Sequence, residues 1–359
     1  MIRLWEEGES ADRGRALFWP CSGEYPVYDD FLYGLMVGDR LRNRLYEQAI
    51  AASCLGKTVV EIGTGADALW ALACARAGAE RVFAIESDEL AATRARDRVA
   101  SAGLGGTVEI VKGLSTAVTL PERADICISE IIGEIGSSEG APAVLNDARM
   151  RHLKEGAMMI PASCVTKVAG VSLPADLRSR PRFQSDGVPY VKAIFDQVGG
   201  VFDVRVAVEN HVGKLRRLTD AGEYERLDFS AGLVAEVGVR EVELVVTRSG
   251  RLDGLALWIE LACETGGEVL DVWGYLSNWL PVYFPLFQGG IEVGAGECIR
   301  FIAETTLSDD GVHPDYTVAG SVLGESGEER ASYRLESLHH GKAFRAHPFY
   351  EVLFEEASF

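Results

Sequence analysis

Two glutamates beside a glycine-rich stretch are the clearest sign of chemistry in this sequence. Glu130 directly follows an apolar run, ADICIS, and Glu139 comes nine residues later, with Gly133, Gly136 and Gly140 between or beside them. A glycine-rich loop can fold back and set two carboxylates side by side, and such a pair repels itself unless a cation or a proton lies between them. A guanidinium suits this site because it is planar, permanently charged and forked for bidentate pairing. The pair therefore predicts a clamp for a guanidinium-like cation.

A second segment, residues 59–89, predicts a nucleoside pocket. An apolar run leads into Gly63 and Gly65, a helical pattern follows, and a second apolar run ends in Glu86. This order is typical of a strand, a tight turn, a helix and a second strand. Glycines let a ligand approach the backbone closely, and the acid can accept hydrogen bonds from both hydroxyls of a ribose. Glu61, in the first of these strands, is a further candidate for cofactor binding.

The residues of the turn favour S-adenosylmethionine over a dinucleotide as the ligand. A dinucleotide fingerprint needs a third glycine where this chain has Ala68, and Asp67 would place a negative charge near the phosphates. S-adenosylmethionine has no phosphate and carries a cationic sulfonium and ammonium, so it tolerates nearby acids. We therefore expect S-adenosylmethionine as cofactor, with S-adenosylhomocysteine as product. A nicotinamide or flavin enzyme and a purely structural glycine turn remain alternatives.

The net charge and the composition limit the kinds of partner that we expect this chain to bind. The net charge of −19, from 54 acids and 35 bases, argues against nucleic-acid binding. The same charge would attract a cationic protein, peptide or small-molecule acceptor, although it would also serve solubility alone. No apolar run approaches the ~20 residues of a membrane span, and the charged first 15 residues lack a signal-peptide core. We expect no membrane partner and a cytoplasmic location.

Cysteines and histidines do not predict a metal site. The seven cysteines are scattered without a C-x-x-C pair, which supports neither a zinc site nor a disulfide framework. A reducing compartment is the simplest setting for them. The six histidines show no ligand spacing, and His339 and His340 are expected to be solvated.

The elements around the two motifs predict an α/β domain followed by an all-β domain. The alternation of strands and helices after residue 57 argues for a parallel sheet, whose carboxyl edge binds the ligand. The expected strands lie near residues 58–62, 81–86, 107–111, 124–129 and 157–160, and the expected helices near residues 67–78, 88–102 and 140–153. Short segments rich in Val, Thr and Leu follow Pro161 and indicate a sandwich or barrel.

We therefore divide the chain into three parts. They are an N-terminal helical segment capping the cofactor site (1–56), a Rossmann-like domain of the class I S-adenosylmethionine-dependent type (57–160) and a C-terminal β-barrel-like domain for substrate and dimerisation (161–359). The first 28 residues look irregular, with Pro20 and Pro26 as breakers. Residues 179–200 look less regular than their surroundings and could form an insertion or a contact arm.

The motifs and their order along the chain resemble those of the protein arginine methyltransferase family. The resemblance is greatest to the type-III, monomethylating branch. The strand ending in Ser-Glu, the glycine loop and the second Glu are similar to the family's double-glutamate loop. MVGDRLR is similar to the family's first helix, which implies that Met36 packs near the sulfonium and Arg42 pairs the cofactor carboxylate. KGLSTAV falls where the family contacts adenine, which makes Ser115 and Thr116 candidates.

The barrel adds a further piece of the resemblance, which spans roughly residues 25 to 300. Pro161 falls at the family's hinge into the barrel, and SNWLPVYFPL resembles its threonine-histidine-tryptophan loop. That comparison implies a place for Asn278 and Trp279 beside the two glutamates in the catalytic site. It also implies a homodimer.

The chain departs from the family pattern at three places. These departures bear on substrate binding and proton transfer more than on cofactor binding. Gly63 and Gly65 match the glycines of the family's first motif, but Asp67 stands where that motif has its third glycine. Asn278 replaces the loop histidine, and an amide can hydrogen-bond but cannot take a proton at neutral pH. Tyr25 and Tyr28 are out of register with the family's double tyrosine.

The resemblance implies N-methylation of a guanidinium on a protein, a peptide or an arginine-like metabolite. Two other hypotheses stay open. One keeps the cofactor but methylates another N, O or C atom of a specialised metabolite or modified peptide. The other is a binding protein with a degenerate site.

Overall fold

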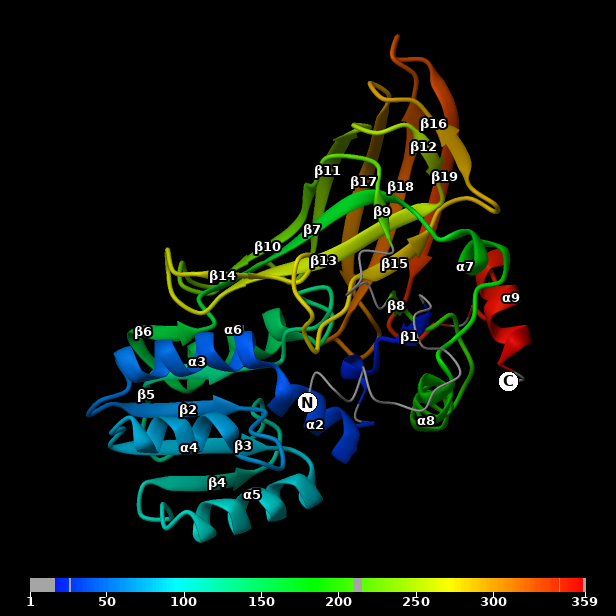
Figure 1. Cartoon of the computed structure of the whole chain (residues 1–359). Coiled ribbons are helices and arrows are strands. Elements are labelled where there is room, and N and C mark those ends of the chain that lie inside the picture. Colours follow the sequence, from blue (N-terminus) through cyan, green and yellow to red (C-terminus); the bar gives the residue numbers. More distant parts are fainter. Residues whose placement is uncertain (1–16, 26, 209–214, 342, 358–359) are drawn as a thin grey trace.

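The computed structural model describes residues 17–25, 27–208, 215–341 and 343–357. The charged N-terminal stretch and the breaker Pro26 lie outside the described residues. Figure 1 shows two parts, a layered α/β part and a larger β-rich part, with the N-terminal helix α2 where they meet.

The α/β part is built on a five-stranded parallel sheet of order β4-β3-β2-β5-β6. Its strands are β2 (Thr58–Ile62), β3 (Arg81–Glu86), β4 (Val108–Lys112), β5 (Ala124–Ser129) and β6 (Leu153–Ile160). Its helices are α2 (Asp30–Gly38), α3 (Arg40–Ser53), α4 (Leu69–Arg76), α5 (Glu89–Ser101) and α6 (Ala141–Arg151). Because helices cover the sheet, β2 is buried along its whole length. The predicted strands and helices of this part are confirmed to within a few residues.

Helix starts place the residues of interest at the carboxyl edge of this sheet. Asp29, Asp39 and Asp88 each accept a hydrogen bond from the first turn of α2, α3 and α5, respectively. Such caps satisfy backbone N–H groups that a helix leaves unpaired. Asp39 therefore fixes the start of α3, where Arg42 stands in the first turn.

The β-rich part consists of antiparallel sheets. One sheet has the order β1-β8-β15-β13-β7-β10, with β14 on β13 and β9 on β7; a second has the order β11-β17-β18-β19; and β12 pairs with β16. The strands are β1 (Phe18–Pro20), β7 (Ser163–Ser172), β8 (Val206–Val208), β9 (Arg216–Arg217), β10 (Gly222–Asp228), β11 (Gly238–Val245), β12 (Gly250–Leu252), β13 (Gly254–Ala262), β14 (Val269–Asp271), β15 (Val282–Pro285), β16 (Ile291–Val293), β17 (Cys298–Leu307), β18 (Pro314–Leu323) and β19 (Glu329–Ser337). The two larger sheets share one apolar core, so this part has the barrel-like architecture that the sequence predicted.

Two local predictions were wrong. Residues 18–20 form β1 rather than an irregular segment, and Pro20 fits there because β1 is an edge strand. Residues 175–198 contain α7 (Ala175–Ser179), a 3-10 turn η2 (Ser185–Gly187) and α8 (Val188–Val198) instead of irregular chain. The apolar side of α8 packs into the core of its own chain, and its role as a contact arm stays a prediction.

Two further elements complete the chain. The 3-10 turn η1 (Ser22–Glu24) follows β1, and the C-terminal helix α9 (Pro348–Glu356) buries Leu353 and Phe354 against the core that contains β1. The sequence analysis did not predict α9. Within the part of the chain that the structure describes, no helix has the length and apolar character needed to cross a membrane.

Candidate active site

The glycine turn after β2 forms the first wall of the site. Gly63 and Gly65 both have positive φ, +74° and +65°, which side-chain-bearing residues rarely adopt. The backbone N–H of Gly65 donates to Glu86 Oε2 at 2.8 Å, and that of Asp88 donates to Glu86 Oε1 at 2.9 Å. Each carboxylate oxygen can accept more than one hydrogen bond, so Glu86 can still accept hydrogen bonds from a pair of hydroxyls.

Glu61 and Asp67 hold this turn in different ways. Glu61 is fully buried and accepts a hydrogen bond from the Thr64 hydroxyl at 2.5 Å. Burial raises the pKa of Glu61 to about 7, and the bond from Thr64 opposes that rise. Asp67 pairs with Arg98 of α5 at 3.1 Å, which offsets its charge. Glu61 therefore supports the turn from within.

Arg42 joins the cofactor side of the site to the glutamate loop. Its side chain is 2% exposed, and Nη1 donates to Glu130 Oε2 at 2.7 Å. The guanidinium also lies 5.3 Å from the centre of the Trp70 ring. Burial raises the pKa of Glu130 to about 7, while the charge of Arg42 opposes that rise. The predicted cofactor ligand and the predicted catalytic acid are thus in direct contact.

Glu139 faces the N-terminal segment rather than Arg42. A Cβ added at Gly23 would clash with Glu139 Oε1, so η1 passes directly over this carboxylate. No hydrogen bond or ion pair to Glu139 is present among the residues that the structure describes. Burial raises the pKa of Glu139 well above its usual range, and the nearby carboxylates of Glu130, Glu134 and Glu24 raise it further. The two clamp glutamates therefore share one region, although only Glu130 has a cation beside it.

The two tyrosines of the N-terminal segment have separate positions. The Tyr28 hydroxyl donates to the carbonyl of Gly23 at 3.1 Å, next to Glu139. Tyr25 is buried and donates its hydroxyl to the backbone carbonyl of His339 in the β-rich part. Only Tyr28 therefore borders the clamp.

The tryptophan loop anchors the site from the barrel side. Trp279 is 3% exposed and its Nε1 donates to the carbonyl of Ile132 in the glutamate loop at 2.6 Å. The Ser277 hydroxyl and the Asn278 backbone N–H both donate to Asp39 Oδ2. The loop therefore contacts both the glutamate loop and the start of α3, and Trp279 serves as a buried support.

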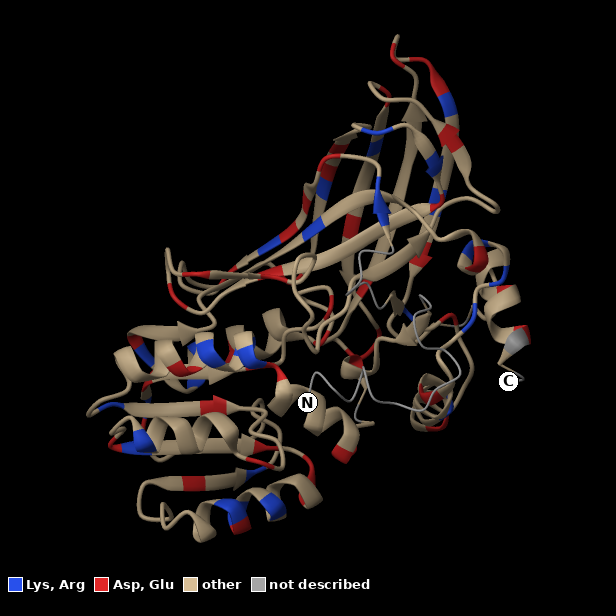
Figure 2. Ribbon diagram, viewed as in Figure 1, with Lys and Arg blue, Asp and Glu red and all other residues tan. Residues whose placement is uncertain are grey.

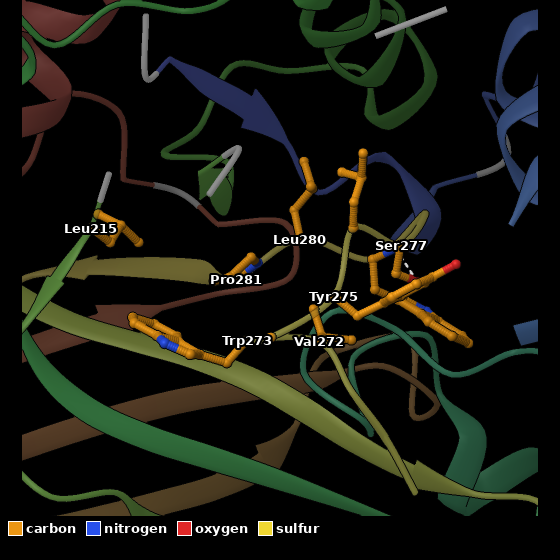
Figure 3. Close-up of a pocket in the computed structure, with 10 residues that line it drawn as sticks. Leu215, Val272, Trp273, Tyr275, Ser277, Leu280 and Pro281 are labelled. Carbon is orange, nitrogen blue, oxygen red and sulfur yellow. Dashed lines mark hydrogen bonds between the residues drawn. The ribbon is translucent and has the colours of Figure 1, made fainter. Parts of the chain in front are cut away.

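A cavity of about 230 Å³ lies beside this loop. Figure 3 shows that Trp273, Tyr275 and Leu280 line it, and the Tyr275 hydroxyl also accepts a hydrogen bond from the N–H of Leu41 in α3. Its lining residues include neither Glu130 nor Glu139. The cavity therefore belongs to the barrel side of the tryptophan loop and not to the clamp.

The remaining cofactor candidates lie at the rim of the site. Met36 is half-buried on α2. Ser115 is buried, and its carbonyl contacts His152 Nε2 at 2.9 Å, whereas Thr116 is exposed. Both follow β4, one strand beyond Glu86 at the same edge of the sheet. Their contacts with a cofactor stay predictions.

The prediction that His339 is solvated was wrong, because this residue is 3% exposed. Its ring stacks between Tyr25 and His313, and its Nε2 lies 3.7 Å from Asp310 Oδ2. Asp310, His313 and His339 form the group with metal-ligand spacing among the described residues. However, the two imidazoles are parallel, with centroids 4.1 Å apart, so their in-plane lone pairs cannot converge on one ion without a ring rotation. The group is therefore explained by hydrogen bonding and stacking.

Charge gathers where the two parts meet. Figure 2 shows acidic segments in the loops between the parallel sheet and the antiparallel sheets. Glu24, Glu130, Glu134 and Glu139 come together here, and the sequence analysis missed Glu24 and Glu134. Glu134 was open to prediction because it stands inside the glutamate loop itself.

The chain is similar in sequence to proteins named as arginine methyltransferases. No protein-family model matches the chain. It is 29% identical over 272 residues to an arginine N(omega)-methyltransferase of Streptomyces achromogenes subsp. streptozoticus, covering 74% of this chain and 73% of that protein. It is 33% identical over 155 residues to protein arginine N-methyltransferase PRMT10 of Arabidopsis thaliana, covering 42% of this chain and only 39% of that protein.

Solved structures show the same fold. The structure of protein arginine methyltransferase 10 of Arabidopsis thaliana matches with a TM-score of 0.72 at 21% identity, covering 89% of this chain and 99% of the other. The PRMT1 enzyme-prozyme heterotetrameric complex with AdoHcy from Trypanosoma brucei matches with a TM-score of 0.68 at 21% identity, covering 85% and 97%. The predicted fold class, a Rossmann-like domain followed by a barrel-like domain, is confirmed.

Proposed function

These relatives confirm the resemblance of the chain to the protein arginine methyltransferase family, and we propose that this methyltransferase transfers the methyl group of S-adenosylmethionine to a guanidinium nitrogen. The observation that carries the proposal is the contact of Arg42 with Glu130. This contact supports the proposal because Glu130 would belong to the acidic clamp and Arg42 would hold the cofactor.

The residues at the sheet edge fit the cofactor. The backbone of Gly63 and Gly65 is open to close approach, and Glu86 retains capacity to accept ribose hydroxyls. Arg42 would bind the cofactor carboxylate, and Met36 would lie near its sulfur. The cofactor would supply a methyl group on a positively charged sulfur. Asp67 does not oppose binding, because Arg98 offsets its charge.

The glutamate loop fits a cationic acceptor. Glu130 and Glu139 would each accept hydrogen bonds from the guanidinium and turn one nitrogen toward the methyl group, so alignment would supply much of the catalysis. A buried carboxylate without a cation is costly, and Glu139 has none among the described residues. A bound guanidinium would provide that charge. Trp279 would hold the loop in place through the carbonyl of Ile132.

The acceptor would be arginine, either free or within a protein or peptide. The bacterial relative is named for arginine and the plant relative for protein arginine. We also propose a homodimer, as the resemblance implies, which light scattering would test.

Mass spectrometry tests the proposal. Purified protein is incubated with S-adenosylmethionine and either free arginine or arginine-containing peptides, with lysine peptides as the control. We expect a mass gain of one methyl group on an arginine acceptor and none on lysine. The absence of methyl transfer to every arginine acceptor would contradict the proposal, and transfer to a different atom would support the alternative acceptor class.

A further inference from the structure

Glu134 is a third acid in the glutamate loop. It lies four residues after Glu130 and five before Glu139. The residue is 9% exposed, and its Oε2 is buried without a hydrogen-bond partner among the described residues. Buried polar atoms are nearly always paired, so an unpaired carboxylate oxygen inside a candidate site points to a function.

The surroundings of Glu134 offer it little positive charge. Glu24 and Cys21 of the N-terminal segment lie within electrostatic reach of it, since Glu134 raises the pKa of the Cys21 thiol and Glu24 raises the pKa of Glu134. Arg205, just before β8, is fully buried, but it forms an ion pair with Glu24 and donates to the carbonyl of Pro314. The guanidinium whose charge acts on Glu134 is therefore already engaged.

Burial and the neighbouring acids both disfavour the charged form of Glu134. Burial raises its pKa to about 8, and the charges of Glu24 and Glu130 act in the same direction. A hydrogen bond from its own backbone N–H and the charge of Arg205 oppose the rise. Glu139 belongs to the same cluster, because Glu134 raises the pKa of Glu139 as well. A carboxylate in this setting binds a proton far more tightly than an exposed glutamate does.

Meanwhile the tryptophan loop presents an amide to the reaction and not a proton acceptor. Asn278 stands where the family has a histidine, and its amide cannot take a proton at neutral pH. Its backbone N–H is held by Asp39, and its Oδ1 has no partner among the described residues. Methylation of a guanidinium releases one proton overall, so another group has to receive it.

We propose that Glu134 accepts the proton that the guanidinium loses during methyl transfer. This inference rests on the proposed function. The carbon–sulfur bond breaks as the carbon–nitrogen bond forms, an N–H bond on the same nitrogen breaks, and an O–H bond forms on Glu134. The product guanidinium stays cationic and remains paired with Glu130 and Glu139. Glu134 thus does the work for which Asn278 has no titratable side chain.

Kinetics of Glu134→Gln test the role. The wild-type kcat should rise with pH as Glu134 loses its proton, because only the carboxylate form accepts one. The variant should lose this rise and show a fall in kcat of about 100-fold, within the range of a lost general base, with little change in KM. Glu134→Asp keeps a carboxylate and should retain part of kcat and the rise with pH. Glu264→Gln makes the same chemical change on an exposed loop and should behave as wild type.

A binding measurement gives a readout that does not depend on turnover. Titration calorimetry with arginine and S-adenosylhomocysteine, repeated in buffers of different ionisation enthalpy, counts the protons released on binding at pH 7. The cation should displace a proton from Glu134 in the wild-type protein, and Glu134→Gln should release fewer. Unchanged affinity for S-adenosylhomocysteine would show that the variant is folded.

The outcomes separate the two proposals. If the wild-type protein is active and Glu134→Gln keeps both kcat and its rise with pH, the role of Glu134 is overturned and the proposed function stands. A loss of acceptor affinity without a loss of kcat also overturns it, since that result assigns Glu134 to binding. Wild-type protein that methylates no arginine acceptor overturns the proposed function and this inference together.

Discussion

The two sides of the candidate site are built differently. The cofactor side comes from adjacent stretches of chain, since Glu61, the glycine turn and Glu86 lie within two neighbouring strands and their connection. The acceptor side is assembled from three distant segments: the N-terminal turn η1, the glutamate loop and the tryptophan loop. Local sequence is therefore enough to build the first side, whereas the second depends on the packing of the barrel.

The two sides also differ in how their charges are balanced. Glu130, at the boundary, is paired with Arg42, and Glu86 is held by two backbone N–H groups. Glu134 and Glu139 lie farther into the acceptor side and have no such cation among the described residues. The cofactor side is thus preorganised by its own chain, and the acceptor side is left short of positive charge until a cation binds.

Substitution of Glu130, at the boundary between the two sides, should have the largest effect on turnover. Glu130→Gln removes a charge that would stabilise the reacting guanidinium, and we expect kcat to fall by at least about 100-fold, as for loss of one preorganised electrostatic partner. Affinity for S-adenosylhomocysteine, measured by calorimetry, should stay within a few-fold. Arg44→Gln, which breaks an exposed ion pair with Glu268, is the control. Turnover at the wild-type rate in Glu130→Gln would remove the clamp from the mechanism.

Gly23→Ala tests whether η1 sets the acceptor side. The new Cβ would meet Glu139 Oε1, so the carboxylate has to move. We expect a loss of about 10-fold in kcat/KM for the acceptor, because small misplacements of reacting groups are costly. Donor affinity should not change.

Gly200→Ala is the matched control for this variant, since nothing lies within 4 Å of its added Cβ. If Gly23→Ala weakened donor binding and acceptor binding equally, the proposed division between the two sides would be wrong.

Stability should depend on pH because of the acceptor side. The pKa of Glu134 is about 8 in the folded protein against an ordinary 4.5, so folding retains a proton that the unfolded chain releases. The stabilisation is present below pH 4.5 and is lost as pH rises toward 8. We expect Tm to fall by at least about 2 °C between pH 6 and 9. Glu134→Gln should flatten this slope, and an equal slope in the variant would show that other groups cause it.

The sequence predicted the cofactor side well because its signals are local. Strand periodicity located β2, β3 and β5, and parallel strands necessarily bring their carboxyl ends to one edge. Glu86 and Glu130 therefore lie at the same edge of the sheet, as expected. The contact of Arg42 with Glu130 went unpredicted, since the resemblance gave Arg42 a cofactor partner only.

Predictions for the acceptor side were poorer because its contacts join distant segments. Nothing in the pattern around His339 indicates that Tyr25, more than 300 residues earlier, covers it. The resemblance implied a place for Trp279 beside the two glutamates. Its indole is buried against the glutamate loop, and a role in the reaction stays a prediction. The sequence analysis did not single out Glu134, because its burial depends on the packing of distant segments.

Ser277→Ala should have the smallest effect on stability and binding, and it tests whether the two sides of the site are linked. The Ser277 hydroxyl donates to Asp39, and the same carboxylate caps α3, from which Arg42 projects. Removing this buried hydrogen bond to a charged group should lower the free energy of unfolding by about 1–2 kcal/mol. Urea denaturation measures that loss, and Ser326→Ala, which removes an exposed serine–carboxylate bond, should cost much less. Because Asp39 touches both sides, Ser277→Ala should weaken donor and acceptor binding together, in contrast to Gly23→Ala. If only one of the two affinities changed, Asp39 would not be the link between the sides.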